Sequence, residues 1–206
     1  MTDTPTQDSV VDQPGWFAEW RRLVDVADQS VYEAVADTPT PRLDHLMVNV
    51  SNAANQSRLW LATAAAMAVL GGRPGRRAAR QGLVAVALAS AVTNLALKPL
   101  AHRRRPAKHA GPGSDSRRVR RPDSASFPSG HAASAFAFAS AAGQATPALW
   151  LPLQAAAAAV AFSRVHTGVH YTSDVFIGAL IGDLCGHVPG WPAPPPRRGA
   201  IGRRGR

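Results

Sequence analysis

Uncharged apolar stretches alternate with polar connectors along most of the chain. Four such stretches are clear: Leu59–Gly72, Gln81–Leu97, Ala132–Ser163 and Val175–Leu184, the last of which contains Asp183. Gly143, Pro147 and Pro152 interrupt the third stretch, and because glycine and proline weaken helices we expect two helices there. The pattern predicts an all-α bundle of about five core helices between residues 45 and 188.

The first 44 residues have a different pattern. Apolar residues recur three or four positions apart and would share one face of a helix: Trp16, Trp20, Leu23, Val24, Ala27 and Val31. The polar face of this amphipathic helix is acidic, which disfavours docking on anionic lipid. We therefore expect the helix, within residues 16–35, to pack beside the bundle and outside its core.

Both ends of the chain read as tails. Residues 1–14 are polar and lack the basic and apolar run of a signal peptide, so we expect disorder and no signal peptide there. Residues 189–206 are rich in proline and arginine, and we expect an extended tail that is solvated or lies against phosphate-rich headgroups. The chain thus divides into an acidic segment (1–44), a helical-bundle domain (45–188) and a tail (189–206).

The net charge of +10 would suit a nucleic-acid-binding protein, but its distribution favours a membrane protein. Residues 1–44 carry a net charge of −6 and the remainder +16. The basic residues cluster between the apolar stretches, at Arg73–Arg80, Lys98–Lys108, Arg117–Arg121 and Arg197–Arg206. Apolar runs joined by basic connectors are typical of a small multi-pass membrane protein. We expect no nucleic-acid partner, because no aromatic residues interleave with the arginines of the tail.

The apolar stretches are short for membrane spans, which keeps a second class open. Spanning the hydrocarbon core takes about 20 residues, so each helix must recruit flanking residues, tilt or pack within a bundle. The alternative is a soluble all-helical domain with buried Ala-rich helices. The 46% hydrophobic content excludes a wholly disordered chain. The single cysteine, Cys185, excludes intramolecular disulfides and multi-cysteine metal sites, and we expect it to be a small buried apolar residue.

Three clusters carry side chains suited to phosphate chemistry. They are Lys98 and Arg105 within KPLAHRRRP, Ser129, Gly130 and His131 within ASFPSGH, and Arg164, His170 and Asp174 within SRVHTGVHYTSD. Only four acidic residues follow position 44, so most of these cations need an external anion. Phosphate suits both the planar fork of arginine and the point charge of lysine. Ser129 and Gly130 precede an apolar helix, whose free N-terminal N–H groups favour an anion.

The histidines supply the reactive groups. His170 and Asp174 are four residues apart, so the carboxylate can accept one imidazole N–H and leave the other nitrogen as base or nucleophile. His131 is available as a general acid for a leaving oxygen. If successive helices alternate in direction, all three clusters fall at one end of the bundle. Together they would make a phosphoryl-transfer site that requires no metal.

The three clusters resemble the signature of the type 2 phosphatidic acid phosphatase family, which shares its core with vanadium haloperoxidases. The resemblance spans residues 98–174 and implies that His170 attacks phosphorus to form a phosphohistidine, which water then hydrolyses. It implies that Asp174 orients His170 and that His131 protonates the leaving group. The phosphoryl oxygens would be held by Lys98, Arg105, Ser129, Gly130 and Arg164, without a metal or cofactor. Thr172 stands where relatives often carry proline, and we expect activity to survive this difference.

We therefore expect a multi-pass cell-membrane enzyme that hydrolyses a lipid phosphate monoester or a lipid diphosphate. Phosphatidate, phosphatidylglycerol phosphate and polyprenyl diphosphate all fit. Basic residues are nearly balanced between the two ends of the bundle, and because anions would neutralise part of the charge at the catalytic end, we expect an extracytoplasmic site. Two rivals stay open: a vanadate-dependent haloperoxidase, and a non-enzymatic membrane protein that binds lipid headgroups.

Several further side chains receive structural interpretations. His166 and His170 could hold a metal from one helix face, but a third ligand is missing, and we expect His166 to support the pocket or to pack between helices. The additional arginines of Arg103–Arg104 and Arg117–Arg121 are expected to anchor lipid headgroups. Asp183 should face the bundle or lie near its far end.

Overall fold

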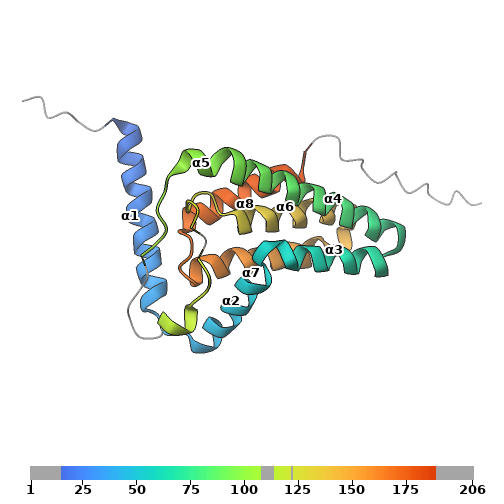
Figure 1. Ribbon diagram of the computed structural model, residues 1–206, viewed down its shortest axis with the longest axis horizontal. Coiled ribbons are helices and arrows are strands. Elements are labelled where there is room, and N and C mark those ends of the chain that lie inside the picture. The colour runs from blue at the N-terminus through green and yellow to red at the C-terminus, as the bar shows by residue number, and fades with distance from the viewer. Residues whose placement is uncertain (1–14, 108–113, 122, 189–206) are drawn as a thin grey trace, which may run out of the picture.

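Helices account for every regular element in the part of the chain that the structure, a computed structural model, describes: residues 15–107, 114–121 and 123–188. The α-helices are α1 (Trp16–Asp37), α2 (Pro41–Ala53), α3 (Arg58–Leu70), α4 (Gly72–Ala91), α5 (Lys98–Ala101), α6 (Gly130–Ala145), α7 (Trp150–His166) and α8 (Thr172–Gly186) (Figure 1). Short 3-10 turns occupy Asn55–Ser57, Ser114–Arg117 and Pro147–Leu149. The expectations for residues 1–14 and 189–206 fall outside the described residues.

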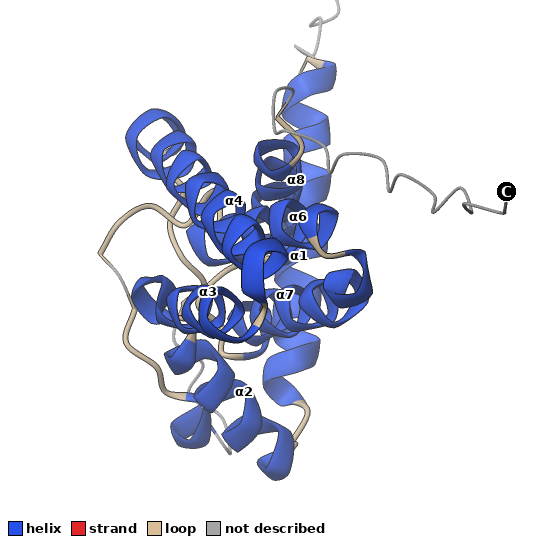
Figure 2. Cartoon of the chain, turned by 90° about the vertical axis from the view of Figure 1, so that its right-hand side faces the viewer, coloured by secondary structure: helices blue, strands red, loops and turns tan. Residues whose placement is uncertain are grey.

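The bundle consists of α3, α4, α6, α7 and α8, which confirms the all-α fold expected from the hydrophobic pattern. Helix α6 lies in the middle, with α4, α7 and α8 packed around it (Figure 2). The long apolar stretch divides into α6 and α7 at Thr146 and Pro147, where the sequence predicts a break. Pro152 sits in the first turn of α7, where a missing N–H removes no bond within the helix.

The basic stretch Arg73–Arg80 corrects one expectation, because it forms the first half of α4 rather than a connector. The turn out of α3 needs only two glycines, and Gly72 adopts a φ of +58°, a conformation that favours glycine. Gly75 then passes so close to α3 that a Cβ there would lie 2.1 Å from the carbonyl oxygen of Met67. Arginine is a good helix former, so the helix begins directly after this tight turn.

Helix α4 continues through a π-helical segment, Val92–Leu97, into α5, and one helix therefore runs from Gly72 to Ala101. Pro99 has no N–H and its ring crowds the carbonyl four residues earlier, so the wider π turn accommodates it. The helix ends at His102, whose φ is +41°. As a result Lys98 lies in the last turn, at the end of the bundle.

A ridge of glycines holds α8 against α6. Gly178, Gly182 and Gly186 lie four residues apart on α8, and a Cβ at the first two would lie 2.4 Å from Ser129 O and 2.2 Å from Ala133 O. Such small-residue contacts let two helix backbones approach closely. The ridge therefore fixes the N-terminus of α8 beside the N-terminus of α6, where two of the three motif clusters lie.

The bundle has large apolar side chains on its outside and small side chains in its interior. Its buried positions are largely alanine, including Ala78, Ala85, Ala89, Ala133, Ala137, Ala139 and Ala142. Large apolar side chains are instead exposed around the bundle, among them Leu61, Val84, Leu95, Leu151, Phe162, Phe176 and Leu184. Two helices, Gly72–Ala101 and Pro147–His166, are long and apolar enough to cross a membrane. A surface of this kind favours membrane association over the soluble alternative.

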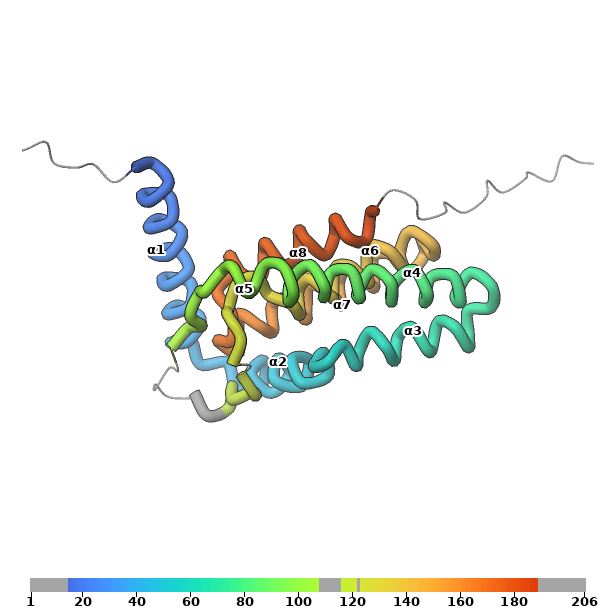
Figure 3. Tube along the Cα trace, turned by 45° about the horizontal axis from the view of Figure 1, so that its top comes forward, coloured from blue at the N-terminus to red at the C-terminus, as the bar shows by residue number. Residues whose placement is uncertain are grey.

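Helix α1 lies across one end of the bundle (Figures 1 and 3), where Asp28 and Tyr32 are its buried residues. The helix thus packs beside the bundle as expected, but its apolar face does not make the contact. Trp16, Trp20 and Leu23 on that face are exposed. Helix α2 packs against α7 and crosses position 44, so the acidic segment and the bundle share this helix.

Candidate active site

The three motif clusters meet at the end of the bundle that α1 crosses. The end of α5, the N-termini of α6 and α8 and the C-terminus of α7 all lie there (Figures 1 and 3). The loop that joins α7 to α8 carries His170, and the connector after α5 carries Arg103 and Arg105. The alternating helix directions expected from the sequence produce this convergence.

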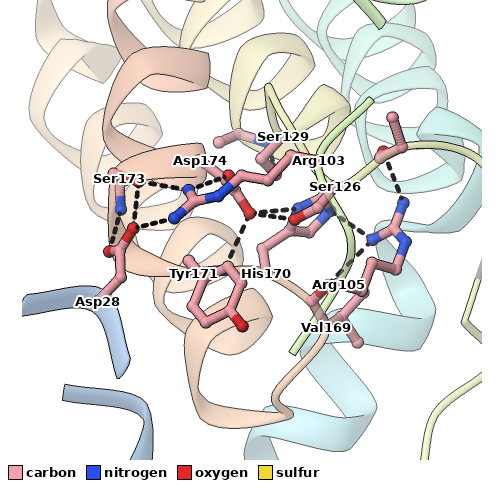
Figure 4. Close-up of polar contacts among 12 residues, drawn as sticks. Asp28, Arg103, Arg105, Ser126, Ser129, Val169, His170, Tyr171, Ser173 and Asp174 are labelled. Carbon is pink, nitrogen blue, oxygen red and sulfur yellow. Dashed lines mark hydrogen bonds and ion pairs between the residues drawn. The ribbon is translucent and has the colours of Figure 1, made fainter. Parts of the chain in front are cut away.

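His170 is 2% exposed and lies between a carboxylate and a guanidinium. Its Nδ1 is 3.5 Å from Asp174 Oδ2, and its Nε2 is 3.1 Å from Arg105 Nη1 (Figure 4). A guanidinium can only donate, so Nε2 accepts, and we assign the imidazole proton to Nδ1. The nitrogen that faces the cations therefore carries the lone pair.

The electrostatics keep His170 neutral. Burial is the main cause that lowers the pKa of His170 to about 4; the Arg105 and Arg164 charges contribute to this shift, and the Asp174 carboxylate opposes it. At neutral pH the imidazole is thus unprotonated at Nε2. A buried neutral histidine with an oriented lone pair is suited to act as a nucleophile or a base.

Asp174 is fully buried in the first turn of α8 and is held by several donors. Its Oδ1 accepts from Arg103 Nη1 at 2.8 Å. Its Oδ2 accepts from the Ser126 hydroxyl and, at 3.0 Å, from the Tyr171 N–H (Figure 4). The contact from Oδ2 to His170 Nδ1 is longer than an ordinary hydrogen bond, so the carboxylate is positioned mainly by these other donors.

Arg164 is 1% exposed and only partly paired. Its Nη1 donates to the Ser51 hydroxyl, but no described residue accepts a hydrogen bond from its Nε or Nη2. Buried donors without partners carry a large desolvation cost, which a bound anion would offset. Arg164 is also close enough to Lys98 and Arg105 for the like charges to repel.

Arg105 and Lys98 extend this cationic group. Arg105 donates to three backbone carbonyls, those of Ser124, Ala125 and Val169, and burial lowers its pKa. Lys98 lies over the N-terminus of α6, since a Cβ on Gly130 would lie 3.7 Å from its Nζ. Three cations therefore surround the region that faces Nε2 of His170.

The N-terminus of α6 closes the site. Ser129 is its buried N-cap, accepts from the Ala132 N–H at 3.5 Å, and donates its own N–H to Asp174 O at 2.9 Å. His131 follows in the first turn, with Nε2 3.1 Å from Asn55 Oδ1. With that amide oxygen as acceptor, Nε2 of His131 carries a proton.

Two arginines contradict the expectation that the additional basic residues anchor headgroups. Arg103 pairs with Asp25, Asp28 and Asp174 at 2.8 Å each. Arg117 pairs with Asp44, also at 2.8 Å. Three of these four carboxylates belong to the acidic segment, so segments of opposite charge fold against each other. The charge count within the bundle could not reveal this pairing.

The hydrogen bonds of Asp44 also explain the position of His166, since Asp44 is the partner of its imidazole. It is buried in α2 and accepts from His166 Nε2 and Arg117 Nε at 2.8 Å each. Burial raises the pKa of Asp44, but the hydrogen bonds from His166, Thr40, Ser116 and Arg117 outweigh it and lower the pKa to about 2. His166 thus packs between α7 and α2, which is one of the two roles expected of it.

Several site contacts have no clear signal in the sequence. Ser126, Ser173 and Asp28 all touch Asp174 or its partners. Ser126 lies within the ASFPSGH cluster, where its place near Ser129 could have suggested a role. Asp28 lies about 75 residues from Arg103, and no local pattern joins them. Among the described residues, no group of three or more His, Cys, Asp or Glu could hold a metal ion.

Comparisons with known proteins agree with this geometry. A sequence model of the PAP2 superfamily matches residues 79–189, more than half of the chain. No curated protein matches. The fold is similar to the first transmembrane PAP2 type phosphatidylglycerolphosphate phosphatase from Bacillus subtilis (24% identity, 79% of this chain and 82% of that one, TM-score 0.61). It is also similar to Aquifex aeolicus LpxE (23% identity, 77% of this chain and 91% of that one, TM-score 0.59).

The matched segment contains all three motif clusters, and the structure brings them together at one end of the bundle. The chain belongs to the PAP2 superfamily, the family that its motifs resemble, and is a phosphoric ester hydrolase.

Proposed function

We propose that the protein hydrolyses a lipid phosphate monoester or lipid diphosphate without a metal, through a phosphohistidine on His170. The observation that carries the proposal is the arrangement around Nε2 of His170. Its lone pair faces a cationic group in which two buried nitrogens of Arg164, Nε and Nη2, have no acceptor among the described residues. A phosphoryl group at this position would meet a nucleophile and unused donors together.

In the first step Nε2 of His170 attacks phosphorus, and the bond from phosphorus to the leaving oxygen breaks. Arg105 transfers its hydrogen bond from Nε2 to a phosphoryl oxygen, which frees the lone pair. Lys98 and Arg164 stabilise the charge that develops on the other oxygens, together with Ser129 and the α6 N-terminus at Gly130.

The negative charge of the bound phosphate favours the doubly protonated form of His131, which gives one proton to the leaving oxygen in this step and returns to the neutral imidazole. Asp174 stabilises the positive charge that the imidazole acquires when its Nε2 is phosphorylated. Water then attacks the phosphohistidine, with His131 as the base, and inorganic phosphate leaves.

The lipid part of the proposal rests on the surface of the bundle. Large apolar side chains surround helices that end at the site, so an amphiphile could keep its tail in the bilayer and its phosphate among the cations. We infer a multi-pass arrangement with the site on the extracytoplasmic face. Phosphatidylglycerol phosphate is a first candidate substrate, since the similar Bacillus subtilis structure is of a phosphatase for that lipid.

The test is phosphate release by the detergent-solubilised protein, measured in EDTA and again with added Mg²⁺. The panel contains phosphatidate, phosphatidylglycerol phosphate, a polyprenyl diphosphate and a soluble aryl phosphate, each repeated with His170→Ala. We expect turnover of at least one lipid in EDTA, and its loss in the variant. Metal-dependent turnover that survives His170→Ala would contradict the mechanism, and vanadate-dependent halide oxidation would favour the haloperoxidase rival.

A further inference from the structure

Asp28, on α1, lies outside the segment that the family model matches but is built into the site. Its carboxylate is 4% exposed. Oδ1 accepts the backbone N–H of Ser173 at 2.9 Å, and Oδ2 accepts from the Ser173 hydroxyl and from Arg103 Nη2, the latter at 2.8 Å (Figure 4). A buried carboxylate with three donors is fixed in position, so Asp28 is a firm attachment point for both partners.

Arg103 connects Asp28 to the reacting groups. While Nη2 binds Asp28, Nη1 donates to Asp174 Oδ1 at 2.8 Å and to Ser173 Oγ at 2.7 Å. The guanidinium also lies 4.5 Å from the centre of the Tyr171 ring. The planar fork of arginine is thus held between two carboxylates, a geometry that lysine cannot reproduce.

We propose that Asp28 is a positioning residue, which acts through Arg103 and Ser173 to aim the Asp174 carboxylate at Nδ1 of His170. The proposal rests on the histidine mechanism above. With Arg103 anchored by Asp28, only Nη1 engages Asp174, and it engages Oδ1. Oδ2 then remains with Ser126 and faces His170. Without the anchor, Arg103 is free to bind both oxygens of Asp174 and to draw Oδ2 away from the imidazole.

Asp25 provides a matched control on the same helix. It contacts the same Nη2 of Arg103 at 2.8 Å, but its side chain is 59% exposed. An exposed ion pair contributes little, because water and salt screen it. Asp28→Asn and Asp25→Asn therefore remove the same charge from the same helix, and only the first removes a buried anchor.

The experiment measures kcat and KM of the detergent-solubilised full chain on the lipid that the wild type hydrolyses best, together with thermal stability. For Asp28→Asn we expect kcat to fall about tenfold with KM little changed, as for other residues that orient a reacting group through a partner. Asp25→Asn should keep wild-type kcat. A loss of stability without a kcat effect, or a change in KM alone, would overturn the proposal and leave Asp28 as a structural anchor.

A double-mutant cycle isolates the route through Arg103, and its Arg103→Lys variant alone still tests the proposal if Asp28→Asn folds poorly. Arg103→Lys should lower kcat by a similar factor with unchanged KM, since lysine cannot bridge two carboxylates. The double variant should be little worse than either single variant, because both break one linkage. Multiplied losses would show independent roles and overturn the proposal. If His170→Ala keeps activity, the proposed function fails instead, whatever Asp28 does.

Discussion

The two sides of the site use arginine in opposite ways. On the closed side, formed by Asp28, Arg103, Ser173 and Asp174, the terminal nitrogens of Arg103 bind three carboxylates and a hydroxyl. On the open side, formed by Lys98, Arg105 and Arg164, two nitrogens of Arg164 have no acceptor in the described part of the chain. In the described part of the chain, Arg105 forms hydrogen bonds only with neutral groups: backbone carbonyls, the Ser124 hydroxyl and His170.

This difference separates positioning from binding. A closed network of opposite charges holds its members in one geometry, which suits a carboxylate that must orient a histidine. Like charges gathered without counter-ions destabilise the free protein, and an anion that fits among them recovers that cost. In the proposed mechanism the phosphate therefore binds on the open side, and His170 lies on the boundary between the two sides.

The largest expected effect comes from the closed side, at Asp174. Asp174→Asn should lower kcat by about 10³- to 10⁴-fold, because an amide cannot stabilise the charged imidazole and can stabilise the wrong tautomer. Steady-state phosphate release measures this loss. Ser126→Ala is the control, since it removes one donor to Oδ2 but keeps the charge, and its loss should be much smaller. Equal losses in the two variants would contradict the role given to the carboxylate charge.

Matched variants of Arg164 and Arg103 should show most clearly that the two sides of the site differ. Arg164→Met should lower kcat/KM by about 10²- to 10³-fold, as removal of an oxyanion donor does, yet raise the melting temperature because it removes an unpaired buried charge. Arg103→Met should lower both activity and melting temperature, since it leaves the buried carboxylates of Asp28 and Asp174 without their cation. Thermal melts in detergent without phosphate measure the direction in which each variant changes the melting temperature. Melting temperatures that shift in the same direction would contradict the distinction.

Stabilisation by inorganic phosphate should distinguish the two sides of the site in the same way, with a smaller effect. A ligand that binds only the folded state stabilises it, so millimolar phosphate should raise the melting temperature of the wild type by a few degrees. Arg103→Lys should retain most of this response, and Arg164→Met should lose it. A response that is unchanged in Arg164→Met would place the anion elsewhere.

The smallest effect concerns the acid limb of activity. The pKa of His170 is lowered to about 4, chiefly by burial. In the proposed mechanism the unprotonated form is the nucleophile. Activity attributable to His170 should therefore be full above pH 5 and be lost as the pH falls through about 4. The measurement is kcat/KM against pH, corrected for the titration of the substrate itself. A limb near the ordinary histidine value of 6.5 would mean that His170 is not desolvated as described.

Local patterns predicted the helices and the convergence of the three motif clusters at one end of the bundle. Uncharged stretches indicated the bundle. The four-residue spacing suggested that His170 and Asp174 meet across a helical turn, and they do lie 3.5 Å apart, but His170 belongs to the loop before α8 and the contact is longer than a hydrogen bond. The glycine ridge of α8 was readable as Gly178, Gly182 and Gly186 at equal spacing, but its partner helix was not. The contacts of the closed side could not be predicted from the sequence, because Asp28 meets Arg103 only after α1 folds across the end of the bundle. At Arg73–Arg80 a local pattern was misleading. The charge suggested a connector, but helix propensity and a tight glycine turn make this segment the start of α4.

The most direct test of the central claim is to trap the phosphoryl group on the protein. Rapid quenching with a ³²P-labelled lipid phosphate should yield an acid-labile, base-stable label on the peptide that contains His170. His170→Ala should give neither label nor turnover. A label on another residue, or turnover with no trapped label together with activity in His170→Ala, would contradict the mechanism.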